Sequence, residues 1–177
     1  MEELTALQAV KARKSTRAYK SQPVPADTLA KIVEAASCAP VAMGKYDSLH
    51  LSVIQDGALL KDIAAGASAM ASRALGVEKN MDFGAPAMVV ISSVPAMMPG
   101  HENLNAGCVA ENMAIAATGL GVDNLVWGAA AAAISQDATL VERAGIPEGF
   151  KPILAVSLGY AAKDEAPKQH AIETNWV

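Results

Sequence analysis

The spacing of apolar residues predicts two helices at the start of the chain. Leu4, Leu7 and Val10 recur at every third position, so they form one face of an opening helix that ends near Arg13. A second helix is expected to begin after Pro25. Its apolar residues follow the helical spacing i, i+3, i+4 and i+7, and they are Leu29, Ile32, Val33 and Ala36.

Four segments have the patterns of β-strands. Apolar and polar residues alternate over residues 49–54, which predicts a strand with two unlike faces. Residues 87–92 form a continuous apolar run rich in Val and Ile, so we expect a strand at the centre of the sheet, buried on both faces. Residues 125–127 and 153–158 are expected to be further strands.

Three more helices are expected between and after these strands. One carries apolar positions at helical spacing, namely Leu60, Ile63, Ala67, Met70 and Ala74. Residues 102–120 are compatible with a helix that is apolar nearly all round, which is typical of a core or dimer-interface helix. Residues 137–144 form a short helix that Gly145 and Pro147 close.

The order of these elements predicts an α/β layered domain in which helices alternate with a few strands. Its 177 residues are enough for one domain, so we expect a single domain over residues 1–177. A polar tail from Lys163 to Val177 closes the chain, and it still carries apolar anchors such as Ile172 and Trp176. We expect this tail to lie on a second subunit.

Composition narrows the class of protein. The chain has 52% apolar and 18% charged residues. This composition argues against a disordered protein and indicates extensive buried helix or contact between subunits. A net charge of −4 argues against generic nucleic-acid binding. No apolar run approaches the roughly 20 residues of a membrane span. The opening Met1-Glu2-Glu3 lacks the pattern of a secretory signal, so a cytoplasmic protein is expected.

The sequence shows no pattern of a metal site. Cys38 and Cys108 belong to no Cys-x-x-Cys pair, and we expect both to be small buried side chains. His50, His101 and His170 lack the spacing of metal ligands. The chain also lacks a Rossmann fingerprint, a Walker loop and a nucleophile elbow.

Positive charge is concentrated at the start of this acidic chain. Five of the fourteen Lys and Arg residues lie in the first twenty positions: Lys11, Arg13, Lys14, Arg17 and Lys20. One interpretation is that they complement the negative end of the first helix, at about 0.3 to 1 kcal/mol each. The other is a phosphate site, because Ser15 offers a hydroxyl between two guanidinium groups.

The same residues resemble a known family. The stretch Arg13-Lys14-Ser15-Thr16-Arg17-Ala18-Tyr19 is similar to the N-terminal signature of the nitroreductase family of FMN enzymes. Further similar segments follow in the family's order over nearly the whole chain; they are residues 23–25, 34–40, 111–113, 119–121, 145–149 and 158–160. The resemblance implies an α+β layered sandwich with a central, mostly antiparallel sheet flanked by helices, and a tail that crosses to the partner subunit.

The resemblance implies a cofactor site around FMN. Arg13 and Ser15, with Lys14 between them, would hold the phosphate, and Arg17 would lie by the pyrimidine edge of the flavin. A guanidinium there stabilises the negative charge of the reduced ring. Lys168 and His170 match tail positions that reach the same phosphate, although a solvated tail histidine is an equal interpretation of His170.

Two further segments are expected near the ring. The resemblance places the main-chain N–H groups of Trp127 and Gly128 near N5 and O4, while the indole of Trp127 is expected to be a core or interface aromatic. The loop that covers the flavin from the partner subunit departs from the family's polar pattern. Here Pro40, Val41, Ala42 and Met43 would make an apolar lid. Asn80 is the candidate for a polar contact from the segment before residue 87.

These features together predict an FMN-dependent oxidoreductase. It would take hydride from NAD(P)H and reduce an electron-poor acceptor such as a nitroaromatic, a quinone or a flavin, as a homodimer with FMN at the interface. The alternatives are an FMN-binding protein without turnover, an enzyme acting on the flavin itself, and a domain that binds an unrelated phosphate ligand through Arg13 and Arg17.

Overall fold

The computed structural model describes residues 4–163, 165–168 and 170–177. Within these residues, four antiparallel strands form one sheet in the order β1-β2-β4-β3. The strands are β1 (Leu49–Ile54), β2 (Ala87–Ser93), β3 (Asp123–Val126) and β4 (Lys151–Gly159). Every residue of β2 is buried, which confirms the strand predicted for the sheet centre.

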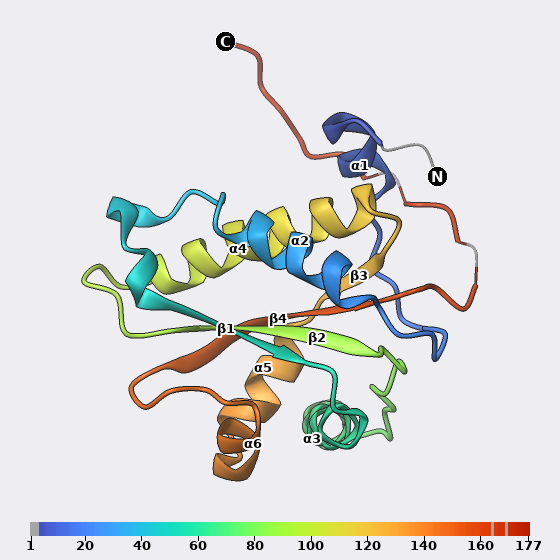
Figure 1. Ribbon diagram of the computed structural model, residues 1–177, viewed down its shortest axis with the longest axis vertical. Helices are drawn as coiled ribbons and strands as arrows, with labels where there is room; N and C mark the ends of the chain where they lie inside the picture. The colour runs from blue at the N-terminus through green and yellow to red at the C-terminus, as the bar shows by residue number, and fades with distance from the viewer. Residues whose placement is uncertain (1–3, 164, 169) are drawn as a thin grey trace.

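Helices cover both faces of this sheet (Figure 1). On one face lie α2 (Ala26–Ala36) and α4 (His101–Gly119), and α1 (Ala6–Ala12) packs against α4. On the other face lie α3 (Gly57–Leu75), α5 (Gly128–Ser135) and α6 (Ala138–Arg143). Two short 3-10 turns, η1 (Ala42–Gly44) and η2 (Tyr46–Ser48), precede β1. The expected α+β layered sandwich with a mostly antiparallel sheet is therefore confirmed.

The side chains of β2 point alternately to the two faces of the sheet and so contribute to two hydrophobic cores. Val89 and Ile91 belong to the core beneath α2 and α4, whereas Met88 and Val90 belong to the core beneath α3 and α5. Successive side chains of a strand point to opposite faces, so one apolar run serves both layers. Each such side chain contributes about 1.5 to 3 kcal/mol when it is fully buried.

The structure departs from the sequence prediction at two helices. α1 begins only at Ala6, after Thr5 and Gln8 form a capping box, and its buried residue is Ala9. Leu7 and Val10, expected to lie on one face of this helix, are exposed in this single chain. α5 was not predicted, because its alanine-rich residues are buried almost all round and show no amphipathic period.

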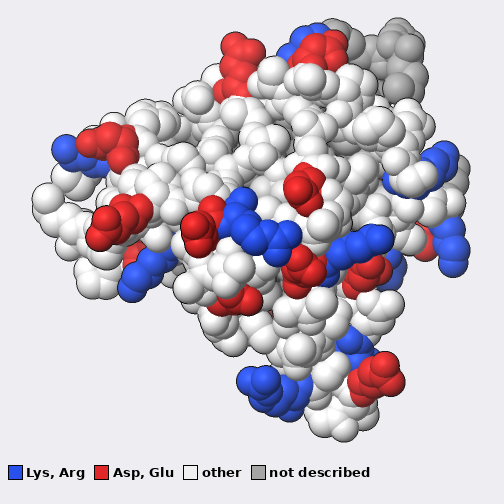
Figure 2. Space-filling view, turned by 60° about the horizontal axis from the view of Figure 1, so that its bottom comes forward, with Lys and Arg blue, Asp and Glu red and all other residues white. Residues whose placement is uncertain are grey.

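Four further features bear on the class of protein: the two cysteines, possible metal ligands, possible membrane-spanning helices and the distribution of surface charge. The expectation that both cysteines are buried was wrong, since Cys38 is exposed and Cys108 is half-buried. In the part of the chain that the structure describes, no group of three or more His, Cys, Asp or Glu side chains is arranged to hold a metal ion. None of the described helices has the length and apolar character to cross a bilayer. Figure 2 shows positive and negative side chains interspersed over one face.

Candidate functional site: a cation-lined cavity at one end of the sheet

The segment after α1 is attached to one end of the sheet. Ser15 pairs with Asn124 in a parallel bridge, and the N–H of Thr16 donates to the Asn124 carbonyl at 2.9 Å. Further along, the N–H of Tyr19 donates to the Phe83 carbonyl at 2.9 Å. The segment thus crosses from β3 toward the loop before β2, which fixes its backbone along the sheet end.

Some side chains of the extended segment after α1, residues 13–19, are buried and others are exposed. Thr16 and Tyr19 are buried, whereas Ser15 and Arg17 are exposed and Arg13 is half-buried. The guanidinium of Arg17 donates to the Ser15 carbonyl at 3.4 Å. The hydroxyl and guanidinium groups predicted to bind phosphate therefore point away from the core on a fixed backbone.

Tyr19 anchors the segment from inside. A Cβ at Gly159 would lie 2.8 Å from Tyr19 Cδ1 and 2.6 Å from Pro86 Cδ, so the close packing requires glycine. The Tyr19 hydroxyl is buried and has no hydrogen-bond partner among the described residues. Burial raises the pKa of Tyr19 above its usual range; the Asp123 carboxylate adds to this rise and Arg17 opposes it. Tyr19 is therefore neutral at physiological pH.

The segment and the C-terminal tail together line a cavity of about 520 Å³. From the segment come Arg13, Lys14, Ser15 and Arg17. Among the described residues, the tail contributes the predicted Lys168 and His170. It also contributes Lys163, which the sequence reasoning missed, and the acidic Glu165. The structure thus brings the two ends of the chain to one positively charged cavity.

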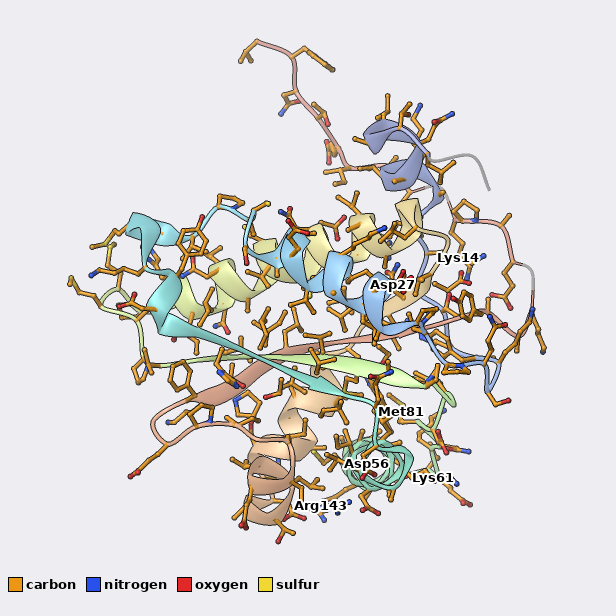
Figure 3. All side chains as sticks on the ribbon, in the orientation of Figure 1. Lys14, Asp27, Asp56, Lys61, Met81 and Arg143 are labelled. Atoms are coloured by element: carbon orange, nitrogen blue, oxygen red, sulfur yellow. The ribbon has the colours of Figure 1, made fainter. Side chains whose placement is uncertain are left out.

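Lys14, one of the residues that line this cavity, has a carboxylate partner. Its ammonium Nζ lies 3.6 Å from Oδ1 of Asp123, the first residue of β3. Figure 3 labels Lys14 in the loop after α1, near β3. Asp123 was not among the predicted site residues, because a single Asp after a turn carries no sequence signal of its contacts.

The main-chain N–H groups of Trp127 and Gly128, which the resemblance places near the flavin, have different surroundings in the structure. The Trp127 N–H donates to the Ala155 carbonyl at 2.7 Å, so sheet pairing uses it. Gly128 is exposed at the first position of α5, where backbone N–H groups have no acceptor within the helix. The indole of Trp127 is buried, with its ring centroid 5.2 Å from that of Phe83, as expected for a core aromatic.

The predicted lid, formed by Pro40, Val41, Ala42 and Met43, lies at the other end of the sheet. The strand register shows this, because the lid precedes Leu49, which pairs with Ser93. Asp123 lies at the opposite sheet end, where it pairs with Gly159. Figure 1 shows the same separation, with η1 on the left and the segment after α1 on the right. Within one chain, the lid does not meet the cation-lined cavity.

The lid has a defined conformation. The buried Asn105 of α4 accepts a hydrogen bond from the Ala42 N–H at 2.9 Å. Met43 has a φ of +57°, a left-handed conformation that is uncommon for a residue with a side chain. Its side chain is exposed. The backbone therefore presents an apolar side chain outward at this end of the sheet.

Asn80 has a local role in the structure. Its side-chain oxygen accepts from the Asp82 N–H at 2.8 Å and so closes a turn. Asp82 and Phe83, two and three residues further on, line a second, mainly apolar cavity of about 370 Å³, together with Trp127. Asn80 is not among the residues that line either cavity.

The sheet and the cavity define a layered α+β protein with a cavity lined by basic side chains at one sheet end. The chain belongs to the nitroreductase family: the sequence model described as "Nitroreductase family" matches residues 10–160. This confirms the family resemblance seen in the sequence.

Two solved structures are similar over nearly their whole length. A nitroreductase with bound FMN from Bacteroides fragilis NCTC 9343 is 25% identical with a TM-score of 0.83, over 98% of this chain and 97% of that chain. A nitroreductase with bound FMN from Desulfitobacterium hafniense DCB-2 is 26% identical with a TM-score of 0.83, over 100% and 99%. No curated protein sequence matches the chain.

Proposed function

We propose that this chain is an FMN-dependent oxidoreductase that takes hydride from NAD(P)H and reduces an electron-poor acceptor such as a nitroaromatic, a quinone or a flavin. The observation that carries the proposal is the cavity where Arg13, Ser15 and Arg17 meet Lys168 and His170. The two similar nitroreductases with bound FMN support it.

The residues of the cavity fit the phosphate of FMN. A phosphate dianion needs positive charge and hydrogen-bond donors, and Arg13, Ser15 and Lys168 supply both. Glu165 is outnumbered by the basic side chains around it. A volume of about 520 Å³ exceeds what a phosphate group alone would fill, so the cavity also has room for part of the ribityl chain.

FMN would supply the redox chemistry, by accepting a hydride and then returning two electrons and a proton to the acceptor. Reduction adds negative charge to the pyrimidine edge of the ring. Arg17, exposed at the cavity, is the group that would stabilise this charge. The N–H of Gly128, at the start of α5, would donate to the ring. The residues of the protein would thus bind FMN, orient its ring and polarise it, while FMN would carry the electrons.

We also propose that the site is completed by a second copy of the chain. The apolar lid at Val41 to Met43 lies at the sheet end away from the cations, so a two-fold partner would bring its lid to this cavity. The exposed apolar side chains of α1 and of the tail, among them Leu7 and Trp176, support an interface there. In this arrangement residues 1–177 form one FMN-binding domain per subunit.

An absorption spectrum of the purified protein, followed during reduction, tests the proposed function. We expect a yellow protein whose colour bleaches with NADH or NADPH under anaerobic conditions and returns when menadione or nitrofurazone is added. A yellow protein that neither nicotinamide cofactor bleaches would favour an FMN-binding protein without turnover. A colourless protein without affinity for added FMN would refute the proposal and favour an unrelated phosphate ligand.

A further inference from the structure

One carboxylate contacts both segments that line the cation-lined cavity. Asp123 Oδ1 lies 3.6 Å from Lys14 Nζ and accepts from the Thr16 hydroxyl at 3.5 Å. Asp123 Oδ2 accepts from the Ala161 N–H at 2.8 Å, where the chain leaves β4 for the tail. The Asp123 side chain is only 25% exposed, so these contacts lie partly out of water.

These two segments carry the basic residues of the cavity. The segment after α1 supplies Arg13, Lys14 and Arg17, and the tail supplies Lys163, Lys168 and His170. Besides the side chain of Asp123, main-chain bonds join the segments, such as the one from the Ala162 N–H to the Ala18 carbonyl at 2.9 Å. Asp123 is therefore a side-chain link between them.

A carboxylate at an anion site has an electrostatic disadvantage. It repels a bound phosphate and offsets the charge of Lys14, so by Coulomb's law alone its removal would strengthen anion binding. The contacts of the Asp123 carboxylate point to a structural role that outweighs this repulsion. We infer that Asp123 is a positioning residue that holds Lys14, Thr16 and the start of the tail in the arrangement that binds the phosphate of FMN. This inference rests on the proposed function.

The charge of Asp123 and its contacts can be separated by a charge-matched variant at the cavity. Glu165→Gln removes one negative charge from the cavity lining, and Asp123→Asn removes one from a residue that contacts this lining. Glu165 is not the residue that bonds Lys14, Thr16 and Ala161. We expect Asp123→Ala to weaken FMN binding roughly tenfold, which is the loss of one to two hydrogen bonds. Asp123→Asn should weaken it less, because its amide oxygen can still accept from Ala161. Glu165→Gln should increase FMN affinity, because it removes a negative charge that repels the phosphate.

The test is equilibrium titration of the apoprotein variants with FMN and with riboflavin, which lacks the phosphate. Positioning of the phosphate site predicts that Asp123→Ala weakens FMN binding and leaves riboflavin affinity unchanged. An equal loss for both ligands would show a general structural role and overturn the inference. Tighter FMN binding by both Asp123→Asn and Glu165→Gln, or unchanged binding by Asp123→Ala, would also overturn it. Wild-type protein with no FMN affinity would instead refute the proposed function, and the inference with it.

Discussion

Ser15 lies beside Asn124 in a parallel bridge, although the two residues are far apart in the sequence. The bridge attaches the cation-rich segment to the edge strand β3. Because Thr16 next to it is buried, the backbone at Ser15 has one orientation, with its side chain outward. In the proposed phosphate site the donors would thus be positioned before the ligand binds, which reduces the entropy lost on binding.

Replacing Arg13 should weaken FMN binding. Arg13→Ala removes a charged hydrogen-bond donor from the cavity lining, and we expect a loss of about 1.5 to 3 kcal/mol in binding free energy. Fluorescence titration of the apoprotein with FMN measures the loss. Arg143→Ala is the control, since Arg143 pairs with Asp62 at 2.7 Å on the other side of the sheet (Figure 3). Equal FMN affinity in the Arg13 variant and the wild type would remove Arg13 from the site.

Replacing Arg17 should change the redox properties of the bound flavin. Without the guanidinium, the negative charge of the reduced ring is less stabilised, so Arg17→Ala should lower the midpoint potential. A tenfold loss of this stabilisation corresponds to about 30 mV for a two-electron couple. Spectroelectrochemical titration gives the value, and Arg17→Lys, which keeps the charge, should lie closer to the wild type. A midpoint potential unaltered by Arg17→Ala would place Arg17 away from the ring.

The exposed face of α1 should contribute to a homodimer. Leu7 is 64% exposed, and burying such a side chain in an interface contributes about 1.5 to 3 kcal/mol. Leu7→Glu should therefore shift the protein toward monomers in sedimentation experiments. Leu75→Glu is a matched control, because Leu75 is 62% exposed at the end of α3, on the other face of the sheet. A shift of the same size in both variants would argue against a specific α1 interface.

Tyr19 should make the fold sensitive to alkaline pH. Burial raises the pKa of Tyr19 in the folded protein, whereas the unfolded chain has the ordinary value of about 10. Above that pH the unfolded state releases the phenolic proton while the folded state keeps it, so the free energy of unfolding falls as pH rises. Urea unfolding at neutral pH and above pH 10 measures this loss.

The matched variant for this effect is Tyr19→Phe. It removes a buried hydroxyl that has no partner among the described residues, so stability at neutral pH should change little or increase. Its loss of stability at alkaline pH should be smaller than that of the wild type. If the two proteins lost stability equally, the titration of Tyr19 would not be the cause.

The elements with a clear period could be predicted from the sequence. β1 was predicted over residues 49–54, as observed, from its alternation of apolar and polar residues. The more buried face of β1 nevertheless carries Ser52 and Ile54, whereas Val53 on the other face is exposed. α5 could not be predicted, since a buried helix made of alanine has no polar face to reveal its period. The spacing of Leu4, Leu7 and Val10 was helical, but the spacing alone does not tell whether this face is buried, and all three side chains are exposed in the single chain.

The charged residues that line the candidate site could be found from the sequence, whereas the contacts of its main-chain groups could not. Arg13, Ser15 and Arg17 form a local motif, and the structure brings Lys168 and His170 to them. The hydrogen bond that uses the Trp127 N–H depends on the register of β3 against β4, which no local pattern encodes. The contacts of Asp123 could not be predicted either, because they come from segments remote in the sequence.

The most direct test of the central claim compares the affinity of the wild-type apoprotein for FMN and for riboflavin. If the cation-lined cavity binds the phosphate, FMN should bind at least tenfold more tightly, a difference of about 1.4 kcal/mol or more. Inorganic phosphate should then compete with FMN and not with riboflavin. Equal affinities for the two flavins would contradict the claim that this cavity holds the phosphate of the cofactor.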